Sequence, residues 1–576
     1  MFKLASRYVA WWGFIGALLF LIVQAACNLF LPTITANIID FGVAKHNLAY
    51  IWQTGIIMLI VSLVGVAAAA GNVYFAATQS MRMGRDLRRD LFNRVTYMSN
   101  ANFDHYGDAS LITRTTNDVT QVQNVTVTML RMMIMAPINL VGAGIMAYLK
   151  NKQLTLIFLV VLPILALVVY LIQHASVRLF RSIQGKTDRI NLILREGLTG
   201  VRVIRAFNRD GYEGTRFNDA NQDLTNTSTR AFELVSLMFP IMTLILSASQ
   251  IAIIWFGAQI IGANQMQIGS LVAFMTYATQ ILMAFMMLSR MFVFIPRASA
   301  SATRIQAVLG TVQDIKDGSK ANTDKAAASL TFDHVSFSYP DAGRPALTDI
   351  SFTAHAGQTI AILGGTGAGK SSLINLIPRL YEVSDGAVSV DGVDVRQLTL
   401  TALHNQVALN QQTAVLFSGT VRSNLIYGAS NATDEQLWAA LATAQADDFI
   451  KAQGGLDAPV EQDGGNYSGG QRQRLAIART ILKPASVYIF DDSFSALDFE
   501  TDAKLRQALR ADHQVQQAVT VIVAQRISTV VNADLILLLD HGRLLDAGTH
   551  EQLKQRNQTY REIIDSQIRE GGEPNA

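Results

Sequence analysis

The sequence predicts a membrane α-helical bundle followed by a soluble α/β domain. Half of the 576 residues are hydrophobic, only 16% are charged and the mean hydropathy is +0.25, values that are typical of membrane proteins. The long apolar runs all lie before about residue 310, whereas the rest of the chain alternates short apolar runs with polar turns. A chain of this length also needs at least two domains.

Six segments of the first half are long and apolar enough to cross a bilayer, which requires on the order of 20 residues. The first one follows Lys3 and Arg7, as a signal peptide would, but it is too long and lacks a small-residue cleavage site. We therefore expect it to be retained as one of six transmembrane helices. The segments lie near residues 13–35, 53–78, 129–149, 154–173, 234–257 and 268–290.

The loops between these segments differ in length and charge. Two long loops, near residues 80–128 and 174–232, are rich in arginine, whereas those near 150–153 and 258–267 are very short. Because an excess of Arg and Lys marks the cytoplasmic side, we expect both termini and both long loops to lie in the cytoplasm.

The long loops contain few Gly or Pro residues and mix apolar with charged side chains. We therefore expect the membrane helices to continue well beyond the bilayer, with breaks near residues 102–104 and 208–211. The two breaks occupy matching positions. They are either contact points for the soluble domain or simple turns, and the pattern does not separate these alternatives.

Charge and cysteine content exclude several classes of protein. The net charge of +3 gives no reason to invoke nucleic acid, and the single cysteine, Cys27, excludes an internal disulfide and a zinc cluster. No acid or base lies deep within a predicted span, which argues against a proton- or sodium-driven transporter.

The last predicted span is rich in aromatic and methionine side chains. Such soft, apolar groups line cavities for hydrophobic ligands, although they more often face lipid or pack against other helices. The side chains concerned are Phe274, Tyr277, Met283, Phe285, Met286 and Met287.

Between the two halves the chain becomes polar and small-sided, from Asp314 to Ser329. This composition is typical of an exposed linker, and a strand pattern begins at Leu330. We expect a transmembrane domain at residues 1–312, a linker at 313–329 and a soluble domain at 330–576.

A strand pattern at residues 359–363 is followed by a glycine-rich segment with the pattern G-x-x-x-x-G-K-[ST], and then by a helical pattern. This order predicts a phosphate-binding loop, because its backbone N–H groups and the start of the helix can surround the phosphates of ATP. Lys370 would reach the β- and γ-phosphates and the Ser371 hydroxyl would bind Mg²⁺. A glycine-rich turn without a nucleotide does not explain the strand, the Lys-Ser pair and the helix together. The predicted loop comprises Gly364, Gly365, Thr366, Gly367, Ala368, Gly369, Lys370, Ser371 and Ser372.

A second apolar strand pattern, at residues 487–490, ends in Asp491. Buried strands deliver a carboxylate to the Mg²⁺ beside a phosphate-binding loop in this way. The pattern is weak alone, but together with the loop it predicts an α/β P-loop nucleotide-binding domain.

The run Asn466 to Arg474, with Ser468, Gly469, Gly470 and Gln471 at its centre, resembles the signature motif of ATP-binding cassette (ABC) transporters. Six spans followed by one cassette also resemble the layout of an exporter half-transporter, and this resemblance covers nearly the whole chain. It implies a fold of six transmembrane helices of the ABC exporter type, with ATP and Mg²⁺ as ligands.

The same resemblance assigns roles to further residues. Tyr339 stands where the family has an aromatic that stacks on adenine, and Gln412 where it has a glutamine that contacts Mg²⁺ and the membrane domain. Asp498 ends the segment that contacts the second cassette. In this family each ATP site is composite, so Ser468 to Gln471 would contact the γ-phosphate held by the opposite chain.

Two positions depart from the family pattern. Asp492 follows Asp491 where the family has a glutamate that orients and deprotonates the attacking water. Its side chain is one methylene shorter, and a misplacement of ~1 Å can cost on the order of 100-fold in rate. A relaxed backbone would instead let Asp492 serve as the base. Gln525 occupies the place of a γ-phosphate-sensing histidine, and glutamine cannot carry a proton or positive charge.

Both departures weaken this chain's own ATP site, while the signature run is complete. The chain therefore resembles the degenerate-site subunit of bacterial heterodimeric multidrug exporters in the cytoplasmic membrane, with a non-identical partner chain and hydrophobic drugs or lipids as the favoured substrates. The alternatives are a homodimeric exporter that hydrolyses ATP slowly and a regulatory membrane protein gated by ATP. The direction of transport follows from the family layout alone.

Overall fold

The computed structural model describes residues 2–321, 327–340 and 342–571, and the chain forms two compact units. The helical unit comprises Met1–Thr96 and Ala109–Gly310. The α/β unit comprises Tyr97–Asp108 and Thr311–Ala576. The short segment Tyr97–Asp108 thus groups with the α/β unit, although it lies between membrane segments in the sequence.

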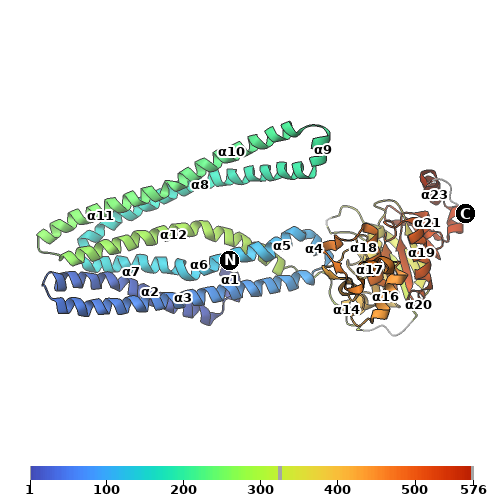
Figure 1. Ribbon diagram of the computed structural model, residues 1–576, viewed down its shortest axis with the longest axis horizontal. Helices are drawn as coiled ribbons and strands as arrows, with labels where there is room; N and C mark the ends of the chain where they lie inside the picture. Colours follow the sequence, from blue (N-terminus) through green and yellow to red (C-terminus); the bar gives the residue numbers. More distant parts are fainter. Residues whose placement is uncertain (1, 322–326, 341, 572–576) are drawn as a thin grey trace. The chain divides into compact units, whose positions relative to one another are not determined.

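The helical unit is built from long helices (Figure 1). Three π-helical segments, η1 to η3, interrupt them. Its elements are α1 (Phe2–Tyr8), α2 (Trp11–Asn37), η1 (Ile38–Val43), α3 (Leu48–Thr96), α5 (Asp108–Thr113), η2 (Arg114–Asp118), α6 (Val119–Thr128), η3 (Met129–Met133), α7 (Ile134–Lys150), α8 (Lys152–Thr199), α9 (Val201–Ala206), α10 (Asp210–Ser236), α11 (Met238–Gly262) and α12 (Ile268–Leu309).

Six helical stretches of this unit are long and apolar enough to cross a membrane, and each contains one of the predicted segments. The six predicted transmembrane helices are therefore confirmed. The helices continue beyond the apolar segments, as expected: α3 alone has 49 residues and is about 74 Å long, more than twice the ~30 Å hydrocarbon core. The stretches are Trp11–Val43, Leu48–Thr96, Asp108–Lys150, Lys152–Thr199, Asp210–Gly262 and Ile268–Leu309.

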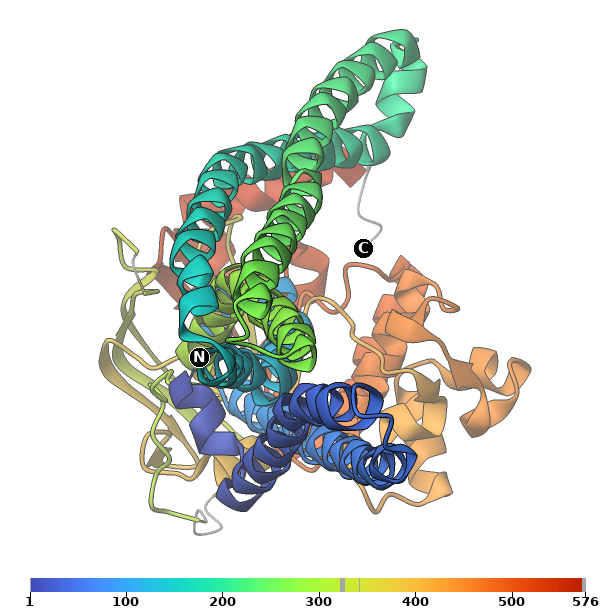
Figure 2. The same ribbon diagram turned by 90° about the vertical axis from the view of Figure 1, so that its left-hand side faces the viewer.

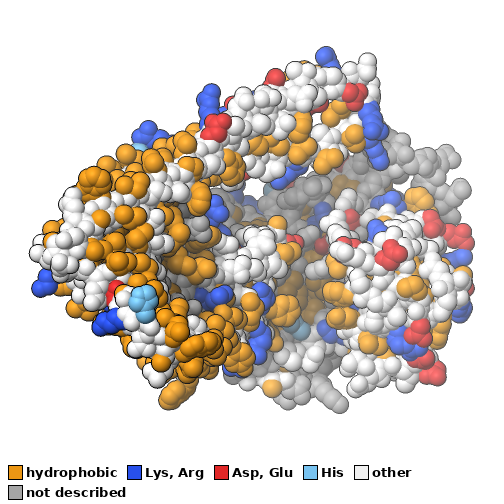
Figure 3. All heavy atoms as spheres, turned by 60° about the vertical axis from the view of Figure 1, so that its left-hand side comes forward, with side chains coloured by type: hydrophobic (Ala, Val, Ile, Leu, Met, Phe, Trp, Pro, Cys, Tyr) orange, Lys and Arg blue, Asp and Glu red, His pale blue; other side chains and the backbone are white. Residues whose placement is uncertain are grey.

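Hydrophobic side chains gather on the face of these helices that Figure 3 shows. Leu59 is 60% exposed, Leu159 71% and Ile251 67%, values that a water-soluble bundle would not tolerate along a whole face. Charged side chains reappear toward the end of the hairpin formed by α8, α9 and α10 (Figure 3). This distribution fits helices that are embedded in lipid and extend into water.

The helices form two groups. α2, α3, α7 and α12 pack together, with small residues such as Ala36 and Ala143 fully buried between them. α8 packs along α10 and α11, and the α8–α10 hairpin extends away from the other helices in both views (Figures 1 and 2).

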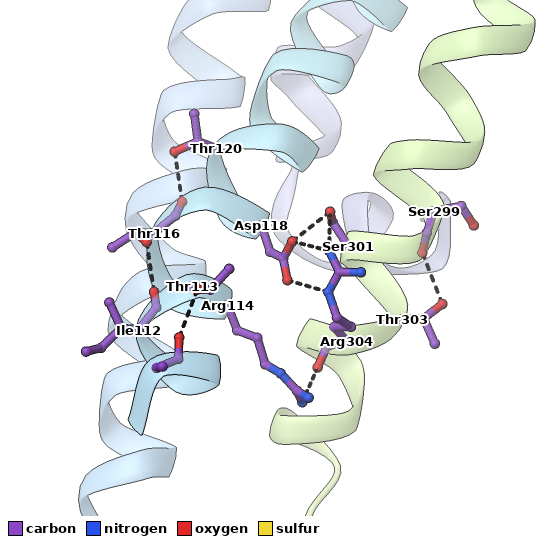
Figure 4. Close-up of polar contacts among 11 residues, drawn as sticks. Ile112, Thr113, Arg114, Thr116, Asp118, Thr120, Ser299, Ser301, Thr303 and Arg304 are labelled. Carbon is purple, nitrogen blue, oxygen red and sulfur yellow. Dashed lines mark hydrogen bonds and ion pairs between the residues drawn. The ribbon is translucent and has the colours of Figure 1, made fainter. Parts of the chain in front are cut away.

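An ion pair between a buried carboxylate and a half-exposed guanidinium links η2 to α12 (Figure 4). Asp118, at the end of η2, accepts hydrogen bonds from Ser301 Oγ at 2.8 Å and from Arg304 Nε at 2.8 Å. Only 4% of the Asp118 side chain is exposed, and Arg114 donates to the Arg304 carbonyl at 3.2 Å. These contacts hold the π-helical turn against α12.

The α/β unit contains a six-stranded sheet and a four-stranded sheet. The six-stranded sheet has the order β12-β11-β3-β10-β9-β6 and is parallel except for β12, while the four-stranded antiparallel sheet has the order β2-β1-β4-β5. The strands are β1 (Ser329–Phe337), β2 (Leu347–His355), β3 (Thr359–Leu363), β4 (Asp385–Val390), β5 (Val393–Asp394), β6 (Val407–Asn410), β7 (Gly419–Thr420), β8 (Pro459–Val460), β9 (Val487–Asp491), β10 (Val519–Val523), β11 (Leu535–Asp540) and β12 (Arg543–Gly548).

Short helices surround these strands in the α/β unit. They are α4 (Asn100–Tyr106), α13 (Lys370–Leu376), α14 (Leu400–Gln406), α15 (Val421–Leu425), α16 (Asp434–Thr443), α17 (Asp447–Ala452), η4 (Gly455–Asp457), η5 (Gln462–Gly464), α18 (Gly469–Ile481), α19 (Phe499–Ala511), α20 (His513–Gln516), α21 (Ile527–Val530), α22 (His550–Arg556) and α23 (Gln558–Gly571).

The strand order positions the candidate site. β3, β9 and β10 are short apolar runs buried on both faces, as parallel strands between helices must be. β10 lies between β3 and β9, and Val523 is in register with both Ile362 and Asp491. The segments that follow these three strands therefore emerge side by side at one edge of the sheet.

The segment predicted to be a linker is in part paired with this unit. Gly318 N donates to the Leu398 carbonyl at 3.2 Å and Lys320 N donates to the Gln397 carbonyl at 2.9 Å. Residues 322–326 of the predicted linker and residues 572–576 of the predicted domain lie outside the described residues.

Candidate nucleotide site

The predicted phosphate-binding loop connects β3 to α13 in a conformation that requires glycine. Gly367 and Gly369 have φ of 82° and 98°, in the region that favours glycine. A Cβ atom at Gly369 would also lie 2.8 Å from Leu347 Cδ2, and one at Gly364 would lie 2.4 Å from the Leu539 carbonyl oxygen. The loop ends at the first turn of α13, where free backbone N–H groups favour anions.

Lys370 lies across the loop. Its Nζ donates to the carbonyl oxygens of Gly364 and Gly365, both at 2.8 Å. Burial lowers the pKa of Lys370, and the carboxylates of Asp492 and Asp491 partly offset this effect. The ammonium group is thus held within the loop by two carbonyl oxygens.

Oxygen ligands for a divalent cation lie beside the loop. Ser371 Oγ is 3.4 Å from Asp491 Oδ2, and Gln412 lines the same cavity. Burial raises the pKa of Asp491, while the hydrogen bond from Ser371 and the charge of Lys370 act in the opposite direction. A hydroxyl, a carboxylate and an amide oxygen suit Mg²⁺, which is commonly held by one or two carboxylates together with phosphate oxygens. Among the described residues no set of three or more His, Cys, Asp or Glu side chains could hold a metal by itself.

The two residues that depart from the family pattern are in direct contact. Gln525 Nε2 donates to Asp492 Oδ2 at 3.0 Å. Asp492 follows β9 with φ of 46°, and its N–H donates to the Val523 carbonyl at 3.0 Å. Burial raises the pKa of Asp492, and Ser495, Lys370 and Gln412 partly offset this rise.

The backbone of Gln525 is hydrogen-bonded to helix α23. Gln567 Nε2 donates to the Gln525 carbonyl at 2.7 Å, and Gln567 Oε1 accepts from Ile527 N at 2.8 Å. Sequence reasoning missed Gln567, because a glutamine in a polar helix far along the chain carries no local signal.

Tyr339 lies at the other end of the loop. Its hydroxyl is 3.0 Å from Ser372 Oγ, and its ring packs edge-on against Phe337 and Tyr381. Tyr381 in turn donates to Asp104 Oδ2 of α4 at 2.7 Å. Of the two predicted breaks, the first, near residues 102–104, lies within the short helix α4, which belongs to the α/β unit. The second, near residues 208–211, lies between α9 and α10 in the helical unit.

These residues surround a cavity of about 630 Å³. The predicted residues that line it are Tyr339, Thr366, Gly367, Gly369, Lys370, Ser371, Ser372, Gln412, Asp491, Asp492 and Gln525. Residues that line it without having been predicted are Arg344, Pro345, Ala346, Val523, His541 and Gly542. The last two form the tight turn between β11 and β12, which the sequence marks as a turn but not as a wall of this cavity.

The signature run lies outside the cavity. Ser468 caps α18: its Oγ accepts from Gln471 N at 3.3 Å, and its N–H donates to Gln471 Oε1 at 2.9 Å. A Cβ atom at Gly469 would meet nothing within 4 Å, so this helix start faces open space. Asp498 caps α19 through Thr501 N at 2.9 Å and is likewise absent from the cavity lining. The rest of the predicted loop is not among the residues that line the cavity: Gly364, Gly365 and Ala368.

The aromatic side chains of the last span are mostly packed. Phe274 and Tyr277 are fully buried, and the Tyr277 hydroxyl bonds Thr33 Oγ1 at 2.7 Å and the Leu29 carbonyl at 2.8 Å. For these two residues, packing rather than cavity lining is the observed role. Met283 is 49% exposed, and Phe285 and Met286 are partly buried against a second apolar cluster.

Comparison with known proteins defines the class. The ABC transporter transmembrane region matches residues 14–285, and the ABC transporter family matches residues 347–495. The chain has the fold of an ABC exporter: it superimposes with a TM-score of 0.78 on a bacterial Atm1-family ABC exporter with ATP bound, covering 98% of each chain at 24% identity.

Sequence relatives make the assignment specific. The chain is 43% identical over 552 residues to an uncharacterized ABC transporter ATP-binding protein of Mycobacterium tuberculosis, covering 95% of this chain and 94% of the relative. It is 37% identical to the uncharacterized ABC transporter ATP-binding protein YfiB of Bacillus subtilis, covering 97% of each. It is 34% identical to the ATP-dependent lipid A-core flippase of Pseudomonas fluorescens, covering 88% of this chain and 84% of the relative. The chain therefore belongs to the ABC transporter family, which implies a multi-pass membrane protein whose ATPase activity drives transport, usually with Mg²⁺.

Proposed function

We propose that the chain is one subunit of a heterodimeric bacterial ABC exporter and that its own phosphate-binding loop forms an ATP site of low hydrolytic activity. The protein would lie in the cytoplasmic membrane, with both termini and the nucleotide-binding domain in the cytoplasm. The observation that carries this proposal is the 3.0 Å hydrogen bond from Gln525 to Asp492.

That contact supports weak hydrolysis for two reasons. Asp492 is one methylene shorter than the glutamate of the family pattern, so its carboxylate stays closer to the end of β9, and a displacement of ~1 Å can cost on the order of 100-fold in rate. One of its oxygens also accepts a hydrogen bond from a neutral amide that cannot move a proton. Asp492, the residue best placed to act as a base, therefore has a shorter side chain than the family glutamate and already accepts a hydrogen bond from Gln525.

Binding of ATP does not need that base. The backbone N–H groups of the loop and Lys370 would hold the phosphates, and the Tyr339 ring would contact the adenine. Ser371, Gln412 and Asp491 would hold Mg²⁺, which supplies positive charge next to the phosphate oxygens. Such a site binds ATP and helps to close the two cassettes, even where hydrolysis at it is slow.

The second, competent site would use this chain's signature run. Ser468 to Gln471 form the capped, outward-facing start of α18, outside this chain's own cavity. A partner chain with an unaltered glutamate and histidine would bring its ATP against this surface. Asp498, exposed at the start of α19, would contact the same partner.

Hydrophobic drugs or lipids are the proposed substrates. The curated relatives include proteins named ATP-dependent lipid A-core flippases, which supports an amphipathic substrate. The apolar outer face of the helices supports access from the bilayer.

The test is ATP hydrolysis by the full chain purified alone in lipid nanodiscs. We expect ATP binding with little turnover, and we expect Asp492→Glu with Gln525→His to raise turnover on the order of 100-fold. Asp492→Glu alone should not restore the site while Gln525 remains. The matched control is Lys370→Ala, which should abolish ATP binding. Robust, substrate-stimulated ATPase activity of the unmodified chain would contradict the proposal and favour a homodimer.

A further inference from the structure

One face of helix α23 packs on the core of the α/β unit and includes a glutamine. Tyr560 is fully buried, and Ile563 and Ile564 are partly buried against the same apolar cluster as Ile527 of α21. Gln567 lies three residues after Ile564, so it falls on the same face of the helix. The spacing of this face predicts an apolar side chain at position 567, and the amide there needs a separate reason.

The Gln567 amide is engaged at both ends. Its Nε2 donates to the Gln525 carbonyl at 2.7 Å, and its Oε1 accepts from Ile527 N at 2.8 Å. Arg526 is the N-cap of α21, but an arginine side chain has no acceptor atom, so Gln567 supplies the acceptor from α23. The Arg526 guanidinium lies over the ring of Phe499, 5.3 Å from its centroid. Gln567 thus fixes the two peptide groups on either side of Arg526.

The Gln525 side chain is the part of this segment that reaches the nucleotide cavity. Because β10 lies between β3 and β9, the residues after β10 emerge between the phosphate-binding loop and the Asp491–Asp492 pair. Gln525, Lys370 and Asp492 all line the cavity, and Gln525 Nε2 donates to Asp492 Oδ2 at 3.0 Å. A lysine in such a loop reaches the β- and γ-phosphates, so Gln525 lies on the side of the terminal phosphate. An amide NH₂ group carries two donors and can bond Asp492 and a phosphate oxygen together.

Capping of α21 does not account for both contacts of Gln567. A cap requires an acceptor only, whereas the Nε2 donor of Gln567 is used on the carbonyl of Gln525. Fixing this carbonyl restricts the backbone rotation of Gln525 and therefore the direction of its Cα–Cβ bond. A displacement of ~1 Å at a phosphate contact is enough to weaken it strongly.

We propose that Gln567 is a positioning residue of the nucleotide site, which directs the Gln525 amide toward the terminal phosphate of a bound nucleoside triphosphate. This inference rests on the proposed ATP site around Lys370, but not on how fast that site hydrolyses ATP. It makes α23 part of the site, although none of its described residues lines the cavity. A nucleoside diphosphate lacks the group that Gln525 would contact, so its affinity should not depend on Gln567.

The test compares two nucleotides that bind to the full chain in lipid nanodiscs with Mg²⁺: ADP, and adenylyl imidodiphosphate, a triphosphate analogue that is not hydrolysed. Gln567→Leu keeps the packing of the side chain but removes both hydrogen bonds. We expect it to raise the Kd of the triphosphate analogue by roughly three- to tenfold, the value of one hydrogen bond, and to leave the Kd of ADP close to wild type. Gln567→Glu keeps an acceptor for Ile527 N but has no donor for the Gln525 carbonyl, so it should act like Gln567→Leu.

Gln558→Leu is the matched control, because Gln558 is an exposed glutamine of the same helix whose Nε2 donates to Glu562 at 2.9 Å. It should leave both dissociation constants unchanged. In a Gln525→Ala background, Gln567→Leu should not raise the Kd of the triphosphate analogue further, since the group that it positions is then missing.

Equal increases in Kd for the triphosphate analogue and ADP would assign Gln567 a structural role only and overturn the inference. A wild-type ratio of the two constants in Gln567→Glu would overturn it as well, and so would an effect of Gln567→Leu that persists in the Gln525→Ala background. Thermal unfolding checks the fold of each variant, and Gln567→Glu, which keeps the cap on α21, decides the test if Gln567→Leu does not fold. Because the analogue is not hydrolysed, these outcomes are separate from ATP turnover, which tests the proposed function.

Discussion

At the scale of single residues, the contact between Asp492 and Gln525 is the basis of the proposed weak hydrolysis. A histidine at position 525 could carry a proton and interact with phosphate as a cation, whereas glutamine contributes only neutral hydrogen bonds. Because the Gln525 amide donates a hydrogen bond to Asp492, the two departures from the family pattern form a single structural feature. A variant that changes only Asp492 to Glu, or only Gln525 to His, therefore keeps the other departure from the family pattern.

A second residue, His404, is expected to make the free energy of unfolding depend on pH. Burial lowers the pKa of His404 below its ordinary value of 6.5, and the charge of Lys483 adds to this effect; Nε2 also bonds the Pro378 carbonyl at 3.0 Å. The unfolded chain binds a proton below about pH 6.5, but the folded chain resists protonation until the pH reaches the lowered pKa. The stability that depends on neutral His404 is therefore complete above pH 6.5 and is lost as the pH falls below it.

We expect His404→Gln to flatten this dependence, because glutamine keeps a donor for Pro378 but does not titrate between pH 5 and 8. The measurement is the thermal unfolding midpoint of the full chain between these pH values, taken as the difference between wild type and variant. A difference that stays constant across this range would show that His404 does not contribute.

At the scale of elements, α4 is linked to the wall of the cavity through two tyrosines. Asp104 of α4 accepts a hydrogen bond from Tyr381, whose ring lies 5.2 Å from that of Tyr339, and Tyr339 contacts Ser372 in the phosphate-binding loop. Burial raises the pKa of Tyr381, and the Asp104 carboxylate adds to this rise, so the Tyr381 hydroxyl remains a donor. We therefore expect ligand binding in the cavity to be coupled to α4 through these contacts.

Tyr381→Phe should interrupt that route while keeping the ring. The lost hydrogen bond is worth about 1 kcal/mol, enough to weaken coupling several-fold. We expect ATP affinity to stay close to wild type and the stimulation of ATPase activity by transported ligand to fall in the assembled exporter. Tyr97→Phe, at an exposed tyrosine just before α4, is the control. Full stimulation in Tyr381→Phe would remove α4 and Tyr381 from the coupling route.

At the scale of the whole molecule, the proposed pairing of two chains fits the separation of the cavity from the signature run within the α/β unit. The cavity around Lys370 lacks a signature run, and the signature run at Ser468 faces open space. The α8–α10 hairpin likewise leaves apolar side chains such as Leu198 and Phe207 exposed, at 77% and 74%. A functional unit of two chains, as proposed above, would complete the cavity and cover the signature run.

In the assembled exporter, Gly469→Val should lower ATP turnover on the order of 100-fold, because a side chain there would displace the phosphate held by the partner. Asp492→Asn should change turnover far less, since the partner's site carries most of it. A Cβ atom at Gly469 meets nothing within 4 Å, so the variant should fold normally. Steady-state ATPase rates of the two variants decide the order, and the reverse order would contradict a division of labour between the sites.

Local patterns in the sequence were sufficient for the six membrane helices, the glycine-rich loop between β3 and α13, and the strand ending in Asp491. Each depends on residues close together in the chain: apolar runs long enough to span a bilayer, a glycine pattern between strand and helix, and a buried strand with a terminal carboxylate. The hydropathy and backbone geometry of a short segment determine such features, so the segment's own sequence is enough to predict them.

Only the tertiary structure decided which of these features meet. The contact between Asp492 and Gln525 spans 33 residues and exists because β10 lies between β3 and β9. Long-range packing also places α4 beside Tyr381 and brings the Gln567 side chain to the Gln525 carbonyl. It likewise buries the amide oxygens of Asn139 and Gln280 without a hydrogen-bond partner among the described residues. A hydrogen bond needs its two atoms within about 3 Å, and the order in which strands and helices assemble, which no local pattern encodes, determines which atoms come that close.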